Sequence, residues 1–125
     1  MSKKRFGIVI VSHVKELAAG LEALLAEVAK EVEITYAGGI EEGAIGTSFE
    51  AIHTAIVEND ADKIFAFYDL GSAKINLEMA IEMTDKTIYL IDAAVVEGAY
   101  TTAALIQADA SFETIMDQLK PLCIK

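Results

Sequence analysis

Short apolar runs alternate with helical patterns along this chain, and that alternation constrains its fold more than any other feature. The runs are rich in β-branched and aromatic residues, as is typical of buried strands, and they cover residues 6–12, 32–37, 63–68 and 86–91. Strands that repeatedly alternate with helices predict a parallel sheet, because parallel strands need long crossover connections. We therefore expect an α/β, doubly wound fold, with a mainly parallel sheet, helices on both faces and one domain over residues 1–125.

The segments between these runs carry apolar residues at the spacing of an amphipathic helix. The clearest stripes are Val14, Leu17, Ala18, Leu21, Leu25 and Val28; then Phe49, Ile52 and Ile56; and finally Phe112, Ile115, Met116 and Leu119. Ser48 and Ser111 directly precede the second and third stripes, and serine is a favoured N-cap residue. These two serines therefore predict the starts of two helices.

The composition narrows the range of partners. Twenty acidic residues against ten basic ones give a net charge of −10, so no basic patch is available for nucleic acid. The hydrophobic share of 54% is high for 125 residues, yet no apolar segment is long enough for a membrane span. We therefore expect no membrane insertion and a homodimer or other homo-oligomer. The single cysteine, Cys123, cannot form an internal disulfide, which favours a cytoplasmic location.

Residues with useful chemistry follow the predicted strands at their carboxyl ends, where open parallel α/β sheets build their sites. These residues are His13 after the first strand; Thr47 and Ser48 in the glycine-rich segment after the second; and Asp69, Gly71 and Ser72 after the third. Because the carboxyl ends of parallel strands meet at one edge of the sheet, we expect these residues to converge.

A histidine beside a carboxylate is suited to nucleophilic or acid–base chemistry. We expect Asp69 to accept the proton of one ring nitrogen of His13, which leaves the other nitrogen free as a nucleophile. The turns at 47–48 and 71–72 offer hydroxyls and helix-start amides to an anion. Together these groups predict a phosphoryl group held on His13, since phosphoryl transfer needs mainly positioning and charge stabilisation.

Each of these residues, taken alone, also has a simpler interpretation. Asp69 and the serines are suited to capping helices, and only their combination favours a site. His53 falls on the apolar stripe of its helix, so we interpret it as a half-buried structural or interface histidine. Two histidines are too few for a typical metal site, and no dinucleotide or P-loop motif is present. We therefore expect no metal and no other cofactor.

Several segments together resemble a known family. They are Gly7-Ile8-Val9-Ile10-Val11-Ser12-His13, Ala18-Ala19-Gly20-Leu21, Gly38-Gly39, Ile45-Gly46-Thr47-Ser48, Asp69-Leu70-Gly71-Ser72-Ala73 with Asn76, and Val96-Glu97-Gly98-Ala99. In this order they are similar to the phosphotransferase subunits of PTS-dependent dihydroxyacetone kinases, which share the fold of mannose-type enzyme IIA domains. The combination resembles the dihydroxyacetone branch of that fold family more than its sugar-transport branch.

The resemblance implies a dimeric phosphotransferase that works through a phosphohistidine. It implies that His13 accepts a phosphoryl group from the phosphocarrier HPr, with Asp69 as the residue that orients the ring. It also implies that the acceptor is ADP bound on the nucleotide-binding subunit of dihydroxyacetone kinase. The phosphoryl group would have as neighbours Thr47, Ser48, Gly71 and Ser72.

One position departs from that resemblance, and two other functions stay open. The family often has a small hydroxyl residue directly after the active histidine, where this chain has Val14. A backbone amide is the expected substitute for the lost hydroxyl. The first alternative function is a mannose-type sugar-transport IIA domain. The second is a non-catalytic module that binds an anion or a protein partner.

Overall fold

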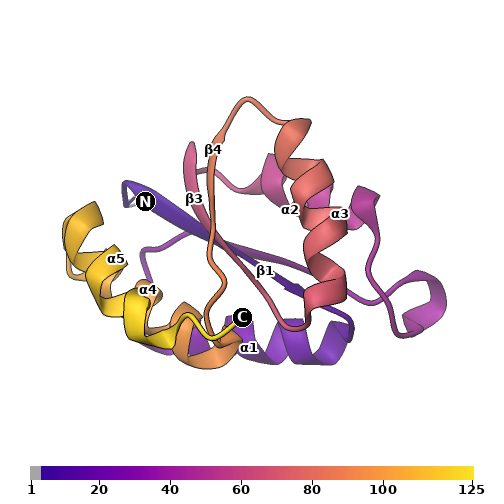
Figure 1. The fold of residues 1–125 in the computed structure, drawn as a ribbon, viewed down its shortest axis with the longest axis horizontal. Coiled ribbons are helices and arrows are strands. Elements are labelled where there is room, and N and C mark those ends of the chain that lie inside the picture. The colour runs from indigo at the N-terminus through magenta and orange to yellow at the C-terminus, as the bar shows by residue number, and fades with distance from the viewer. Residues whose placement is uncertain (1–3) are drawn as a thin grey trace.

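The structure, a computed structural model, describes residues 4–125 and is built on a four-stranded parallel sheet (Figure 1). The strands are β1 (Phe6–Ser12), β2 (Ile34–Gly38), β3 (Lys63–Tyr68) and β4 (Thr87–Leu90). Their order across the sheet is β2-β1-β3-β4, and every neighbouring pair runs parallel. The predicted α/β sheet is therefore confirmed.

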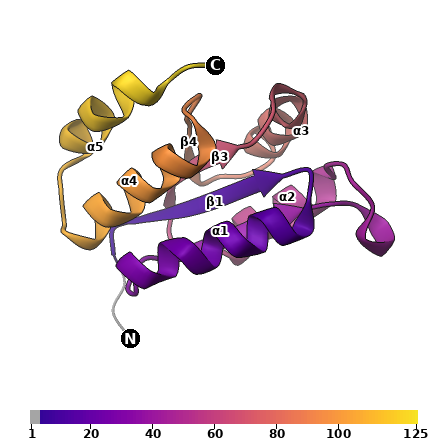
Figure 2. The same cartoon turned by 90° about the horizontal axis from the view of Figure 1, so that it is seen from below.

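Helices cover both faces of this sheet, as the sequence predicts. They are α1 (Lys15–Val28), α2 (Phe49–Glu58), α3 (Gly71–Glu82), α4 (Val95–Gln107) and α5 (Phe112–Leu119), with short 3-10 turns η1 (Glu41–Gly43) and η2 (Lys120–Leu122). One face is covered by α1, α4 and α5, and the other by α2 and α3 (Figure 1). On the first face α1 and α4 pack against each other (Figure 2). No helix within residues 4–125 is both long and apolar enough to cross a membrane.

The central strand β1 explains why the first apolar run is continuous. All seven of its residues are buried, and successive side chains point to opposite faces. Ile8 and Ile10 pack in the cluster that contains α1, α4 and α5, whereas Val9 and Val11 pack in the cluster that contains α2 and α3. A strand covered on both faces is apolar along nearly its whole length, here Phe6 to Val11, and it therefore lacks an alternating pattern.

The two inner strands match the predicted bounds, whereas the two outer strands shift. β2 begins at Ile34 rather than at residue 32 because the Val32 amide donates to the Ala29 carbonyl at 3.2 Å, in a turn after α1. β4 is shorter at both ends than the predicted run. An outer strand has a partner on one side only, so its ends are fixed by local turns that the apolar pattern does not reveal.

The helix starts and faces follow the sequence with one exception. Ser48 and Ser111 accept hydrogen bonds from the third amide beyond each of them, at 3.2 and 3.1 Å, which confirms both N-caps. Leu17 belongs to the predicted stripe of α1 but is 46% exposed. The buried residues of that helix are Ala18, Leu21 and Leu25. The face of α1 that meets the sheet is therefore narrower than the stripe.

The direction of winding reverses between β1 and β3, and open α/β sheets build their sites at the carboxyl ends of such strands. β1 leads through α1 to β2 on one side, and α2 then returns the chain to β3 on the other side. The Asp69 amide donates to the Val11 carbonyl at 3.1 Å, so the pairing of the two strands continues one residue beyond β3. His13 and Asp69 therefore emerge side by side.

The side-chain amide of Asn59 is buried at the opposite, amino end of the sheet. Asn59 is 1% exposed, and its Nδ2 donates to the Ile8 carbonyl at 3.0 Å and to Thr35 Oγ1 at 3.1 Å. Its Oδ1 accepts from the Ala61 amide at 3.0 Å. A Cβ on Gly7 would lie 2.5 Å from that oxygen, so only glycine fits beside it. The amide thus ties β1, β2 and the approach to β3 together.

Candidate functional site

The imidazole of His13 is held at both of its ring nitrogens. Nδ1 lies 2.9 Å from Asp69 Oδ1, and Nε2 lies 2.7 Å from Ser72 Oγ. The His13 side chain is 17% exposed, so the ring is enclosed but still reached by solvent. The structure thus brings together three of the predicted site residues, which come from the ends of β1 and β3 and from the first turn of α3.

The carboxylate of Asp69 is surrounded by donors. Its Oδ2 accepts from Ser12 Oγ at 2.8 Å and from the His13 amide at 2.9 Å, while Oδ1 also accepts from the Leu70 amide at 2.7 Å. Burial alone would raise the pKa of Asp69, but the hydrogen bonds from His13, Ser12 and Leu70 outweigh it and hold that pKa below its ordinary value. Asp69 is therefore an ionised acceptor at neutral pH.

The ionised carboxylate determines which nitrogen of the neutral ring carries the proton. A carboxylate can only accept, so Nδ1 of His13 must be the donor to Asp69. Nε2 is then left with a lone pair, and the Ser72 hydroxyl donates to it. This arrangement leaves Nε2 with the lone pair that a nucleophile needs, on the side of the ring that faces the start of α3.

Three helices begin at this edge of the sheet without a side-chain cap, and two of them, α1 and α3, begin beside His13. The N-cap residues are Val14 for α1 and Leu70 for α3, and neither side chain accepts a hydrogen bond from its helix. The first amides of a helix lack partners within the helix, so the amides of Gly71 and Ser72 are donors beside the Ser72 hydroxyl. Together with the helix dipole, they make the start of α3 suitable for an anion next to His13.

The segment that contains Thr47 is fixed to both His13 and α3. The Gly46 amide donates to the His13 carbonyl at 2.9 Å, which holds the segment beside the histidine. Thr47 Oγ1 accepts from Asn76 Nδ2 at 2.9 Å, and Asn76 lies one helical turn beyond Ser72. Thr47 therefore borders the site, although its hydroxyl is bonded to Asn76 rather than to the ring.

Ser48 and His53 both make structural contacts at α2 rather than contacts with the His13 ring. The Ser48 hydroxyl caps the helix, as described above, and it lines a groove of about 740 Å³ that His13 does not line. His53 is half-buried, its ring stacks on Phe49 with centroids 5.8 Å apart, and its Nε2 lies 3.4 Å from the Met83 carbonyl oxygen. Its geometry agrees with a structural histidine. Across residues 4–125, no cluster of three or more His, Cys, Asp or Glu side chains is close enough to hold a metal.

Comparison with known proteins identifies the family. The family described as PTS system fructose IIA component matches residues 7–116. The DhaM phosphotransferase subunit of a PTS-dependent dihydroxyacetone kinase from Lactococcus lactis subsp. lactis is 50% identical over 120 residues, which are 96% of this chain and 98% of that protein. The DhaM phosphoryl donor subunit of PEP-dependent dihydroxyacetone kinase 1 from Listeria innocua is 50% identical over 122 residues, 98% of each chain. The chain belongs to the DhaM family.

The fold agrees with this assignment. A crystal structure of a protein of unknown function matches this one with a TM-score of 0.83 and 27% sequence identity, over 97% of each chain. The DhaM family consists of phosphoryl donor subunits of dihydroxyacetone kinases, and the predicted resemblance to it is confirmed.

Ser12 is the residue of the candidate site that sequence reasoning missed in this member of the DhaM family. It is 2% exposed, and its hydroxyl donates to Asp69 and accepts from the Val14 amide at 3.0 Å. The available signal was that Ser12 is the only polar side chain in β1. Because the Val14 amide is bonded to Ser12, it is not a free substitute for the hydroxyl that the family often has at position 14.

Proposed function

We propose that this chain is the phosphoryl donor subunit of a phosphoenolpyruvate-dependent dihydroxyacetone kinase and that His13 carries the phosphoryl group. The observation that supports this most strongly is the position of the His13 ring between Asp69 and Ser72. Asp69 holds the proton on Nδ1, so Nε2 is the attacking atom. Membership of the DhaM family supports the same role.

The reaction is two in-line displacements at phosphorus. In the first, the Nε2 lone pair of His13 attacks the phosphorus on the phosphohistidine of HPr; the new N–P bond forms, and the electron pair of the old one returns to the donor nitrogen. In the second, a terminal oxygen of ADP on the kinase nucleotide-binding subunit attacks the same phosphorus. The bond to Nε2 then breaks, and ATP forms without a net proton transfer.

The start of α3 would stabilise the phosphoryl group. The Ser72 hydroxyl donates to Nε2 in the resting site, and it must turn away when that nitrogen forms a bond to phosphorus. It can then donate to a phosphoryl oxygen, beside the amides of Gly71 and Ser72. Thr47 and Ser48 are proposed as further phosphoryl neighbours, with Thr47 supported by its fixed position beside α3.

The surface supports two further parts of this proposal. The net charge of −10 would attract basic protein partners electrostatically. Ile75 and Met79 on α3 and Met83 at its C-cap follow one another at helical spacing and are exposed in the single chain, which supports a homodimer. A cytoplasmic location remains a prediction, based on the lone free cysteine.

The decisive experiment follows the phosphoryl group on the intact chain. The protein is incubated with phosphoenolpyruvate, enzyme I and HPr, and its mass and the acid lability of the adduct are measured. His13→Ala should abolish uptake, whereas the matched variant His53→Ala should take up the group like the wild type. Adding the kinase nucleotide-binding subunit with ADP should then discharge the wild-type protein and form ATP.

Three other results would change the conclusion. Uptake that persists in His13→Ala would overturn the assignment of His13. Uptake at His13 without discharge to ADP would instead favour a sugar-transport IIA domain. The absence of any uptake would favour a binding module, whose ligand would be sought by thermal stabilisation.

A further inference from the structure

Lys125 is far from His13 in sequence, but its ammonium group is hydrogen-bonded to the backbone beside the Asp69 side chain that contacts the ring. Lys125 Nζ donates to the carbonyl oxygens of Tyr68 and Asp69, the latter at 3.1 Å. The same ammonium lies 4.2 Å from the centroid of the Tyr68 ring. Tyr68 ends β3, and Asp69, which follows it in the turn toward α3, is the Nδ1 partner of the His13 ring. The Nε2 partner, Ser72, lies in the first turn of α3 directly after that turn.

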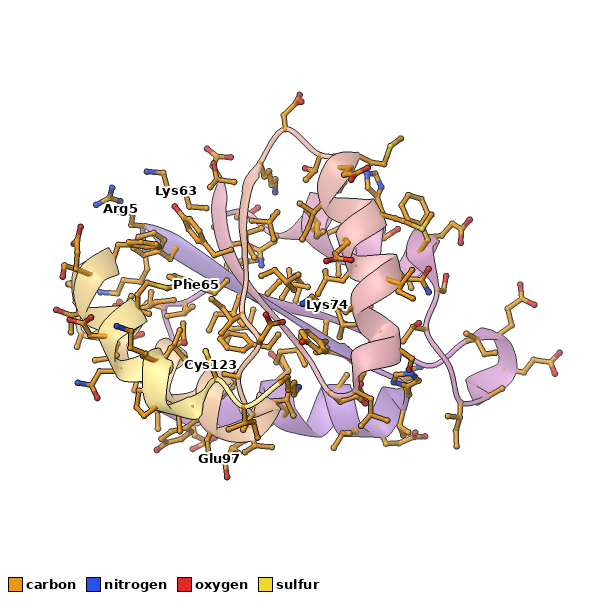
Figure 3. The ribbon with its side chains drawn as sticks, viewed as in Figure 1. Arg5, Lys63, Phe65, Lys74, Glu97 and Cys123 are labelled. Atoms are coloured by element: carbon orange, nitrogen blue, oxygen red, sulfur yellow. The ribbon has the colours of Figure 1, made fainter. Side chains whose placement is uncertain are left out.

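The backbone of the segment after η2 holds Lys125 in this place. The Ala94 amide donates to the Leu122 carbonyl at 2.9 Å, and the Lys125 amide donates to the Asp92 carbonyl at 3.2 Å. Ala93 and Cys123 form an antiparallel bridge between these contacts. The segment, where Figure 3 labels Cys123, is thus paired with the residues that follow β4. Lys125 therefore reaches the turn after β3 from a fixed backbone.

A second set of contacts joins the same turn to α3. Tyr68 donates its hydroxyl to Asp92 Oδ1 at 2.5 Å, and Lys74 Nζ lies 3.0 Å from the same oxygen. Lys74 extends from α3 toward the strands (Figure 3). Burial and the Asp92 carboxylate raise the pKa of Tyr68 to about 12, so the phenol stays a donor. The start of α3, which carries Ser72, is thereby fixed to the same cluster as Lys125.

We propose that Lys125 is a positioning residue for phosphoryl transfer, because it fixes the turn that carries Asp69 and leads into the start of α3, where Ser72 lies. It touches neither the ring nor any reacting atom, and it acts through the backbone of Tyr68 and Asp69. Without this lysine, the turn keeps its strand pairing but loses the donor that holds its carbonyls. The inference rests on the proposed function for its kinetic consequence, but not for its effect on the ring.

The charges around Lys125 are consistent with a role in holding the turn after β3. Burial lowers the pKa of Lys125, while the carboxylates of Asp69 and Asp92 oppose that shift. An ammonium placed among carbonyl oxygens and facing two carboxylates is strongly directed toward them. Methionine has a chain of similar length without charge or donors, whereas arginine keeps both. These two substitutions separate the hydrogen bonding from simple packing.

The test compares Lys125→Met, Lys125→Arg and the control Lys120→Met in the full chain. Lys120 is an exposed lysine of the same C-terminal region, so its substitution changes the net charge equally. One measurement is the initial rate of phosphoryl uptake from phosphorylated HPr over a range of HPr concentrations. The other is the ¹⁵N NMR signature of the His13 ring, which reports how much of the neutral ring carries its proton on Nδ1.

We expect Lys125→Met to lower the maximal uptake rate roughly 10-fold with little change in the half-saturating HPr concentration, because misplaced groups slow a reaction without weakening docking. The share of rings protonated on Nδ1 should fall in the same variant. Lys125→Arg should restore both readouts, and Lys120→Met should leave both at wild-type values. Thermal melting checks that each variant is folded.

Wild-type values of rate and tautomer in a folded Lys125→Met protein would overturn the proposal, as would an equal loss in Lys120→Met. If the wild-type chain takes up no phosphoryl group, the proposed function fails, yet the tautomer still decides whether Lys125 positions the ring. A normal tautomer in Lys125→Met would then reject the positioning role by itself.

Discussion

Each end of the sheet has a network of hydrogen-bonded polar side chains. The two networks differ in whether every polar atom has a buried partner within the fold. At the amino end, the Asn59 side chain is buried, and each of its polar atoms is bonded to a partner within the fold. At the carboxyl end, His13 is partly exposed, and its Nε2 is bonded only to the exposed hydroxyl of Ser72. The Asn59 network has no free polar atom for a ligand. In the His13 network, the Ser72 hydroxyl is a partner that a ligand can replace.

The helices also differ in how their first turns are capped. α2 and α5 are capped by the side chains of Ser48 and Ser111. α1 and α3 begin beside His13 behind Val14 and Leu70, whose side chains cannot cap. α4 also begins without a side-chain cap, behind Ala94, so an uncapped start is not confined to the candidate site. The starts of α1 and α3 are the two that lie beside His13, where free amides can serve a ligand.

Among variants that keep His13, the largest effect should come from Asp69→Asn, which changes the Nδ1 partner of the ring. An asparagine amide turned toward the ring presents a donor to Nδ1 and so favours the tautomer with the proton on Nε2. Phosphoryl uptake should then slow by about 10,000-fold, as when a catalytic histidine is held in the wrong tautomer. Initial rates of uptake from phosphorylated HPr measure this loss. Asp117→Asn, an exposed change on α5, is the matched control and should keep the wild-type rate.

Asn59→Leu should lower stability without slowing uptake, because it removes the buried amide at the amino end of the sheet. The Ile8 carbonyl and the Ala61 amide would lose the partner that Asn59 provides, and the free energy of unfolding should fall by about 3 kcal/mol. Uptake per folded molecule should stay unchanged. Urea unfolding followed by circular dichroism measures the first quantity.

The chain offers a matched comparison for this change, since Asn76 is its only other asparagine. Asn76 is half-buried and bonds Thr47 at the carboxyl end. Asn76→Leu should lower the free energy of unfolding by about 1 kcal/mol at most, while slowing uptake. If Asn59→Leu slowed uptake more than Asn76→Leu did, the two ends would not be functionally distinct.

The sequence predicted the parts of this molecule that depend on apolar pattern and on strand ends. The bounds of β1 and β3 and the meeting of His13 with Asp69 follow from a buried run and from parallel pairing. Asn59 was not foreseen, because in sequence it lies in a polar stretch that looks exposed. Its burial becomes evident only once Gly7 has left room for it.

Lys125 was beyond sequence reasoning for a related reason. Its contacts depend on where the segment after η2 crosses the end of the sheet, and no periodicity encodes that path. Ser12 is an intermediate case: its polarity within β1 was visible, but its role requires knowing that Asp69 lies beside it. Contacts between distant segments therefore make up most of what the sequence did not predict.

Acid should weaken the carboxyl end through Asp69. Hydrogen bonds hold the pKa of Asp69 below its ordinary value in the folded chain, so ionised Asp69 stabilises the fold above the pKa of the unfolded chain. That contribution is lost as the pH falls from about 4 through the folded pKa. Asp69→Asn should therefore show a shallower loss of stability over this range, measured by urea unfolding at each pH. Equal slopes in the two proteins would contradict this effect.

The smallest expected effect is a gain, from Val14→Thr at the uncapped start of α1. The backbone of Val14 is extended, with φ −124° and ψ 124°, which is the conformation of an N-cap residue. A threonine hydroxyl would accept from a free amide of the first turn, and the free energy of unfolding should rise by about 0.5 kcal/mol. Phosphoryl uptake should stay within about 3-fold of wild type, because the positions of Asp69 and Ser72 around the ring do not change.

Val28→Thr makes the same exchange of atoms at the other end of α1, where no amide needs a cap. Val28 is partly buried against the core, so there the hydroxyl should only destabilise. A higher free energy of unfolding for Val14→Thr, together with a lower one for Val28→Thr, would show that the start of α1 beside His13 is less stable than it could be. A single capping hydroxyl would then be enough to restore that stability. Equal losses at both positions would mean that the amides at this helix start are already satisfied, and the contrast between the two ends of the sheet would then rest on His13, Asp69 and Ser72 alone.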